Sequence, residues 1–322
     1  MKVLVTGATG FIGSALIEYL ANIQRFTVVG MMRLNNDCNI STTVEFRLGE
    51  VGSLNKLDIN LSDINVVVHT AGRVHIMNDG SSNSIEDFRR MNTAGTLYLA
   101  RLAADSGVKR FVFLSSIKVN GEMTRPGYPF TPCDVYVPDD PYGLSKYEAE
   151  QGLLALAKET GMEVVIIRPP LVYGPGVKAN FASMMKWMSR SIPLPFGAIH
   201  NKRSLVALDN LVSFISLCAD WEKSPKAANQ VFLISDGEDV STTQLLRKVG
   251  EAFNHKSPSS MKVWLVPVPV SIMTFFAKLL GKGDVANRLF SSLQVDSSKA
   301  RDLLGWKSVV SMDQQLAKMI KK

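Results

Sequence analysis

The sequence predicts an α/β fold in which a doubly wound parallel sheet is covered by helices on both faces. Two observations carry this prediction: short β-branched runs alternate with stretches of helical spacing, and a glycine-rich turn joins the first run to the first helix. The length of 322 residues allows one large α/β core with a smaller appended domain.

The elements follow in chain order. Strands are predicted at Val3–Thr6, Thr27–Met31, Val44–Leu48, Val66–Thr70, Phe111–Ser115 and Val164–Arg168, and helices at Ser14–Ala21 and Asn92–Ala104. Gln230–Ile234 is typical of one more strand, so we expect the chain to return to the sheet before its C-terminal helices.

The character of the sequence changes after Arg168. Five prolines follow within about thirty residues, namely Pro169, Pro170, Pro175, Pro193 and Pro195. We therefore expect residues 1–169 to form the first domain, rejoined by about 203–215 and 229–236, and residues 170–322 to form mainly a substrate-binding lobe.

Composition and net charge limit the classes of protein to which this chain can belong. Hydrophobic residues make up 46% and charged residues 20%, as in soluble globular proteins. The net charge of +7 comes from scattered residues, which favours a pocket for an anionic small molecule over nucleic-acid binding. The three cysteines and four histidines form no metal-ligand spacing, so no metal and a reducing, cytoplasmic location are predicted.

The sequence predicts neither export through a signal peptide nor a membrane-spanning helix. Met1-Lys2 leads directly into the first strand, which leaves no room for a signal-peptide core. The apolar stretch from Val263 to Ala277 is shorter than the roughly 20 residues that span a bilayer, and Pro267 and Pro269 interrupt it. A packed loop and helix is favoured over membrane contact.

The glycine-rich turn carries the first chemical signal. Gly7 and Gly10 let the backbone turn tightly and approach a pyrophosphate, and Gly13 lets the helix pack closely on the strand. The helix N-terminus then offers unpaired N–H groups to the phosphates. This arrangement is typical of a Rossmann-type dinucleotide site.

A second signal lies downstream, where Tyr142 and Lys146 are spaced to share one face of a helix. We expect the ammonium to lower the pKa of the phenol, so that Tyr142 can exchange a proton with a carbonyl oxygen. Ser116 follows a strand and would donate a second hydrogen bond to that oxygen. With the glycine turn, this trio predicts a nicotinamide-dependent redox enzyme.

These motifs resemble, over nearly the whole chain, the extended short-chain dehydrogenases/reductases of the nucleotide-sugar epimerase/dehydratase family. The matching residues are Thr6 to Gly13, His69-Thr70-Ala71-Gly72, Asn92 with Gly95-Thr96, Phe113 to Ser116, Tyr142 to Lys146, Arg168-Pro169 and Tyr173-Gly174-Pro175.

The resemblance implies roles for particular residues. Ser116, Tyr142 and Lys146 would form the catalytic triad, with Lys146 also holding the nicotinamide ribose. Besides the three glycines, Tyr142 and Lys146, the cofactor would contact Thr9, Phe11, Ile12, Arg33, Glu50, Val51, Thr70, Ala71, Gly72, Asn92 and Pro169. The UDP-sugar would meet Lys118, Asn180, Phe181, Phe196, Arg203 and Arg288.

Two departures refine the expected reaction. Relatives that eliminate water carry Asp-Glu where this chain has Ile117 and Lys118, so dehydration is disfavoured. The acid that would select NAD at the end of the second strand is replaced by Met32, and Arg33 follows. A guanidinium suits a 2′-phosphate, which favours NADP(H), with NAD(H) possible.

Three functions stay open at this point. The favoured one is an NAD(P)H-dependent 4-keto reductase of a UDP-4-keto-6-deoxy-N-acetylhexosamine in surface-polysaccharide synthesis. The alternative is a C4-epimerase of a UDP-hexose or UDP-N-acetylhexosamine with retained NAD. A remote third is a non-catalytic, redox-sensing cofactor-binding protein. The family suggests a homodimer made by the helices around Asn92–Ala104 and Tyr142–Ala157.

Overall fold

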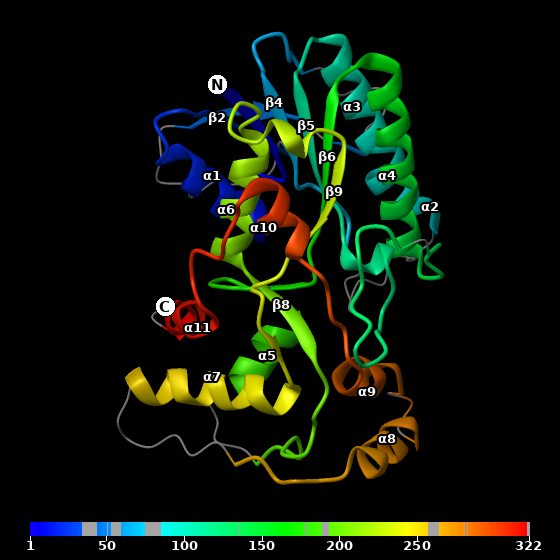
Figure 1. The fold of residues 1–322 in the computed structure, drawn as a ribbon, viewed down its shortest axis with the longest axis vertical. Coiled ribbons are helices and arrows are strands. Elements are labelled where there is room, and N and C mark those ends of the chain that lie inside the picture. The colour runs from blue at the N-terminus through cyan, green and yellow to red at the C-terminus, as the bar shows by residue number, and fades with distance from the viewer. Residues whose placement is uncertain are drawn as a thin grey trace.

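The computed structural model describes residues 1–33, 44–49, 51–52, 59–74, 85–134, 136–177, 179–188, 193–256, 264–279, 281 and 283–320. Seven strands form one parallel sheet in the order β3-β2-β1-β4-β5-β6-β9 (Figure 1). They are β1 (Lys2–Thr6), β2 (Thr27–Met32), β3 (Glu45–Leu48), β4 (Val66–His69), β5 (Arg110–Leu114), β6 (Glu163–Arg168) and β9 (Gln230–Leu233). Each lies within one residue of its predicted bounds, which confirms the predicted parallel sheet.

Helices cover both faces of this sheet. On one face α1 (Phe11–Ala21) and α6 (Leu208–Ala219) pack on Val3 and Val5, while on the other α3 (Gly95–Asp105) and α4 (Pro141–Thr160) pack on Leu4. Successive strand residues point to opposite faces, so one strand serves two apolar cores. The order of strands reverses between β1 and β4, where ligands of such sheets bind.

The helix predicted at Asn92–Ala104 has a different beginning from the one expected. A short helix α2 (Ile85–Phe88) runs into the π-helical turn η1 (Arg89–Ala94), and regular α-helix starts only at Gly95. Asn92 therefore lies in the widened turn, a type of feature often found at functional sites.

A smaller lobe holds a second sheet of β7 (Leu171–Tyr173), β8 (Arg203–Ala207) and β10 (Asp239–Val240). Its core is closed by α5 (Ala179–Met188), α7 (Thr242–Lys256) and α11 (Met312–Ile320). Of the two segments expected to return to the first domain, 229–236 contributes β9, whereas 203–207 forms β8 of this second sheet. Val206 of β8 and the following helix, α6, nevertheless join the core of the larger sheet.

The remaining elements are two short helical turns and three helices near the C-terminus. Short helical turns are η2 (Ile117–Val119) and η3 (Pro225–Ala227). At the lower end of Figure 1 lie α8 (Val270–Leu279) and α9 (Gly283–Phe290), and α10 (Ser298–Leu304) then runs back to β9.

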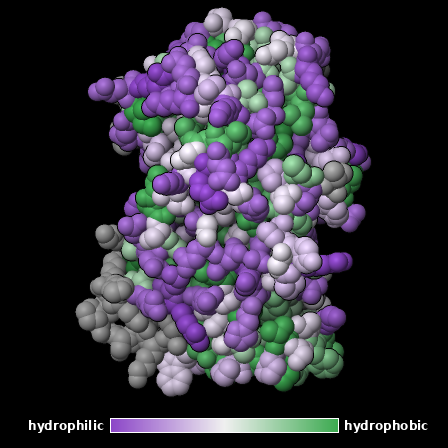
Figure 2. Space-filling model, in the orientation of Figure 1, coloured by the Kyte–Doolittle hydropathy of each residue, from purple (hydrophilic) through white to green (hydrophobic). Residues whose placement is uncertain are grey.

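The prediction that the apolar stretch Val263–Ala277 is packed is confirmed at Leu265, which joins the small core, and is wrong for α8. None of the residues of α8 is buried, and Phe275 is 65% exposed. The helix lies at the end of the lobe and packs mainly on α9, so among the described residues no core covers most of its apolar surface. Figure 2 shows apolar residues gathered at the lower right, where Figure 1 places α8. No helix among the described residues has the length and apolar content to cross a bilayer.

Candidate active site

Parallel pairing brings the predicted motifs to one edge of the large sheet. Thr6 lies opposite His69, and His69 lies opposite Phe113. Because these strands end together, the segments that follow them, beginning at Gly7, Thr70 and Ser115, meet at the carboxyl edge.

The glycine turn is shaped for close approach by a phosphate group. Gly7 has φ +68°, and a Cβ there would lie 2.9 Å from the amide nitrogen of Ala71. A Cβ on Gly13 would lie 2.1 Å from the carbonyl oxygen of Gly7. Gly10 begins α1 with no side-chain cap and no acidic residue in the first turn, which leaves this end of the helix suited to an anion. The turn therefore fits the pyrophosphate of a dinucleotide.

A buried hydrogen-bonded chain fixes the neighbouring loop at 70–72. Thr6 Oγ1 accepts a hydrogen bond from the Ala71 amide at 3.2 Å and lies 2.7 Å from His69 Nδ1. His69 Nε2 lies 3.0 Å from Thr96 Oγ1. Burial, with the nearby Lys146 charge, lowers the pKa of His69 to about 3, so this histidine is a neutral structural group.

The helix α4, which carries Tyr142 and Lys146, begins with a specific cap. The Asp140 carboxylate accepts from the Gly143 amide at 3.1 Å, and Pro141 occupies the first turn. A Cβ on Gly143 would lie 2.5 Å from Asp140 Oδ2 and 2.9 Å from the Pro138 Cβ, so a larger residue would displace the capping carboxylate. The cap sets where Tyr142 and Lys146 lie on the sheet edge.

The predicted trio is assembled at this edge. Lys146 is 4% exposed, and its Nζ donates to the Leu114 carbonyl oxygen at 3.0 Å. The same ammonium lies 4.6 Å from the centre of the Phe113 ring, a cation–π contact. Tyr142 is half-buried and hydrogen-bonded with Ser116. A Cβ on Gly72 would lie 3.2 Å from Lys146 Nζ, so the 70–72 loop and Lys146 are neighbours.

The pKa of the Tyr142 phenol differs from the expected one. Burial raises the pKa of Tyr142 to about 12, the hydrogen bond from Ser116 opposes the rise, and the Asp140 charge adds to it. Burial also lowers the pKa of Lys146 to about 8, with the Glu150 charge opposing the fall. In the chain by itself, desolvation of the Tyr142 phenol outweighs the stabilisation of the phenolate that was expected from the Lys146 ammonium. The predicted lowering of the Tyr142 pKa is therefore wrong for the chain by itself.

Asn92 has structural partners that the motif did not reveal. Its amide Oδ1 accepts from the Arg73 amide at 2.8 Å, and Nδ2 donates to the Arg73 carbonyl and to Ser145 Oγ, each at 3.0 Å. The π-helical turn thus ties the loop after β4 to α4.

A buried ion pair below the trio was missed by the sequence reasoning. Glu150 is fully buried, pairs with Arg168 at 2.5 Å and accepts from Ser115 Oγ at 2.5 Å. Arg168 also donates to Asn120 Oδ1 at 2.9 Å. Tyr142, Lys146 and Glu150 are spaced four apart, so the signal that could have found Glu150 was its place on the same face of the helix.

The other predicted cofactor residues lie in several environments. Thr9 and Arg33 are exposed, Phe11, Ile12, Thr70 and Ala71 are partly buried, and Pro169 is buried with its carbonyl accepting from the Ile117 amide at 3.0 Å. Val51 is 5% exposed within the core around Leu4, and Glu50 lies outside the described residues.

The predicted substrate residues are spread over both parts of the molecule. The Lys118 ammonium contacts Glu122 at 2.9 Å and Asp140 at 3.1 Å. Phe181 stacks on Tyr173 in the small core, which Phe196 also joins. Arg203 is partly buried and donates to the Ser291 carbonyl at 3.0 Å. Asn180 and Arg288 fall in α5 and α9, but their side chains lie outside the described residues.

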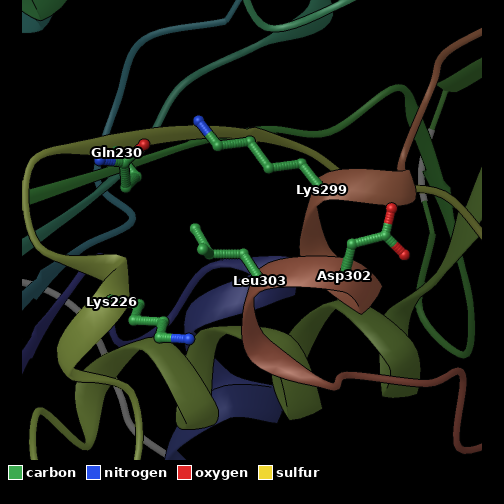
Figure 3. Close-up of a pocket in the computed structure, with 5 residues that line it drawn as sticks. All are labelled: Lys226, Gln230, Lys299, Asp302 and Leu303. Carbon is green, nitrogen blue, oxygen red and sulfur yellow. The ribbon is translucent and has the colours of Figure 1, made fainter.

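A separate open pocket of about 530 Å³ lies at the β9 edge (Figure 3). It is lined by Lys226, Gln230, Lys299, Asp302 and Leu303, none of which is a predicted site residue. Lys299 donates to the Val231 carbonyl at 3.1 Å and so holds α10 against the strand. This pocket shares no residue with the site around Tyr142.

Known proteins resemble this chain in sequence and in fold. The model of the NAD dependent epimerase/dehydratase family matches residues 3–233. The chain is 49% identical over 307 residues to a UDP-glucose 4-epimerase of Vibrio cholerae, covering 95% of this chain and 90% of the relative.

Two solved structures share the fold. One is a UDP-glucose 4-epimerase of Thermotoga maritima with UDP-glucose, with TM-score 0.77, 24% identity and coverage of 100% of this chain and 98% of that one. The other is a UDP-glucuronic acid 4-epimerase of Bacillus cereus in complex with NAD, with TM-score 0.75, 22% identity and coverage of 100% and 99%.

The resemblance drawn from the motifs is confirmed, because the family model spans both the glycine turn and the Tyr142–Lys146 pair and the Vibrio relative matches along almost the full chain. The chain belongs to the NAD-dependent epimerase/dehydratase family.

Proposed function

We propose that this enzyme inverts C4 of a UDP-hexose or UDP-N-acetylhexosamine with retained NAD. The observation that carries the proposal is the 49% identity to a UDP-glucose 4-epimerase over 95% of the chain. The site supports it, because the trio can accept and return the proton of a sugar hydroxyl beside a dinucleotide-shaped turn.

The cofactor would be held by the glycine turn, the 70–72 loop and Lys146. When bound, a nicotinamide supplies reversible acceptance of hydride from a carbon that bears a hydroxyl group. The fit is supported by Gly7, Gly13 and Gly72, at which a Cβ would meet backbone or polar atoms at 3.2 Å or less.

Each residue of the trio then has one task. Tyr142 takes the proton of the C4 hydroxyl as the C4 hydride leaves, and it gives the proton back when hydride returns to the opposite face of the keto sugar. Ser116 hydrogen-bonds the same oxygen, and its hydrogen bond to the Tyr142 phenol favours the ionised form. Lys146 would hold the nicotinamide ribose. No net oxidation results, because the hydride and the proton that leave are both restored.

The test is to incubate the purified enzyme with UDP-glucose and UDP-GlcNAc and follow C4 configuration by proton NMR. Substrate deuterated at C4 should keep its label in the epimer, because the same hydride returns. Tyr142→Phe should abolish inversion. Tyr147→Phe is the matched control, since residue 147 lies about 1.4 turns further along α4 and faces another side of the helix. No C4 inversion with either sugar would refute the proposal.

A second candidate is the NADPH-dependent 4-keto reductase, which one observation favours. Arg33 is exposed directly after β2, and neither it nor Met32 is acidic. A guanidinium there suits the 2′-phosphate of NADP. Stoichiometric loss of NADPH absorbance with UDP-4-keto-6-deoxy-GlcNAc, reduced in Arg33→Ala, would establish this function in place of epimerisation.

We also propose that the chain is cytoplasmic and forms a homodimer through the outer faces of α3 and α4. These helices lie side by side and are linked by the Arg101–Glu159 ion pair at 2.7 Å. Light scattering of the purified protein tests the dimer, and a monomeric mass would exclude it.

A further inference from the structure

One side chain joins the turn after Ser116 to the start of the helix that carries Tyr142. Lys118 belongs to η2, the turn that follows Ser116, and its ammonium lies 3.1 Å from Asp140 Oδ1. Asp140 is the N-cap of α4, and its carboxylate accepts a hydrogen bond from a backbone amide in the first turn of that helix. Lys118 therefore reaches from the end of β5 to the residue that fixes where α4 begins.

The backbone of Lys118 takes part in the same junction. Its amide donates to Ser116 Oγ at 3.3 Å, which leaves the hydroxyl proton of Ser116 for the hydrogen bond to the Tyr142 phenol. A Cβ on Gly143 would lie 3.3 Å from the Lys118 carbonyl oxygen, so the turn and the helix meet closely there. Lys118 thus holds Ser116 through its amide and the helix of Tyr142 through its side chain.

The η2 turn is itself fixed on the large sheet. Ile117 is buried, and its amide donates to the Pro169 carbonyl oxygen at 3.0 Å. Asn120, also buried, accepts from Arg168 at 2.9 Å. The contact between Lys118 and Asp140 therefore ties α4 to a turn that is anchored at the ends of β5 and β6.

The same contact changes the charge beside the phenol. Burial raises the pKa of Tyr142, and the Asp140 charge adds to the rise. An ammonium in contact with that carboxylate offsets its effect at the phenol. Other charged side chains on the surrounding elements are Lys146 on α4, Glu122 after η2, Arg73 after β4 and Asp87 on α2. Among the described residues, Lys118 is the one that forms an ion pair with Asp140.

We propose that Lys118 is a positioning residue of this site: its ammonium holds the Asp140 carboxylate, fixes the start of α4 against η2 and keeps Tyr142 within hydrogen-bonding reach of Ser116. This role differs from the sugar contact expected from the sequence, because the ammonium acts on a carboxylate of the protein. The inference rests on the proposed role of Tyr142 as the proton carrier, and its first test needs no sugar reaction.

The first test follows the ionisation of Tyr142 in the purified enzyme as isolated. Tyrosine is replaced by 3-fluorotyrosine, whose phenol ionises at lower pH, and the fluorine resonance that Tyr142→Phe removes is followed by NMR. Lys118→Met should raise the pKa of this phenol by about 0.5 pH unit, the size expected for a partly exposed charge. Lys118→Arg keeps the charge and should titrate as the wild type does. Asp140→Asn keeps a capping side chain, and in that background Lys118→Met should cause less than about half of the shift.

The second test is steady-state inversion of UDP-glucose and UDP-GlcNAc. Lys118→Met should lower kcat about tenfold and leave the KM of the sugar unchanged, because a displaced α4 misplaces Tyr142 without removing a sugar contact. Lys118→Arg should recover most of the rate. Glu122→Gln is the control, since it removes the other partner of Lys118, a carboxylate that is 45% exposed, and should match the wild type.

Three results would overturn the proposal. The first is an unchanged titration of Tyr142 in Lys118→Met that circular dichroism shows to be folded. The second is an equal shift in the presence and absence of the Asp140 charge, which would mean that Lys118 does not act through Asp140. The third is a raised KM at unchanged kcat, which would make Lys118 a sugar contact. If the wild type inverts neither sugar, the proposed function is refuted, and the titration still decides the role of Lys118.

Discussion

Replacing Glu150 with glutamine should destabilise the protein far more than the same change two residues earlier in α4. Glu150 and Arg168 have side chains 1% and 7% exposed, and two guanidinium nitrogens of Arg168 bond the carboxylate at 2.5–3.2 Å. Glu150→Gln leaves the Arg168 guanidinium buried without a counter-charge. Breaking such a pair costs about 3–5 kcal/mol, and the retained amide oxygen places this variant near the lower end.

Urea denaturation measures the free energy of unfolding, and Glu148→Gln is the matched control. Glu148 pairs with Arg89, which is 49% exposed, so solvent screens that pair and the control should unfold close to the wild type. The loss for Glu150→Gln would be a large share of the roughly 5–15 kcal/mol that stabilises a typical domain. Equal midpoints for the two variants would refute the reasoning that the buried pair holds α4 on β6.

The remaining predictions concern the cofactor turn, the trio and the buried histidine. Gly13→Ala should abolish dinucleotide binding measured by calorimetry, because its Cβ would lie 2.1 Å from the Gly7 carbonyl oxygen; undiminished binding would contradict the assigned turn. Tyr142→Phe should lower kcat by at least about 100-fold with cofactor affinity intact, and retained turnover would remove Tyr142 as the proton carrier. Since the folded pKa of His69 is lowered to about 3 from 6.5, the unfolded state binds more protons between these values, so stability is retained above pH 6.5 and falls as pH decreases. A plot of the free energy of unfolding against pH should approach a slope of about 1.36 kcal/mol per pH unit between the two pKa values of His69, and His69→Gln should remove this slope. A variant with an unchanged slope would exclude His69 as its source.

The sequence alone determined the parallel sheet and the motifs at its edge. Strand positions follow from local β-branched runs, and the glycines and the Tyr142–Lys146 spacing encode backbone and helix geometry within a few residues. Both kinds of information are local, which is why the predicted strands and the assembled trio agree with the structure.

Only the tertiary structure decided the pKa values and ion pairs at the site and the exposure of the apolar stretch Val263–Ala277. The pKa of Tyr142 depends on how much water surrounds it, and the Glu150–Arg168 pair joins residues on two elements of the fold. In α8, Ile272, Phe275, Phe276 and Leu279 have the spacing of the apolar face of a core helix. The fold places this helix at the end of the lobe, where all four side chains are exposed. Burial is a property of the packed chain, so hydrophobic spacing predicts a helix but cannot say what covers it.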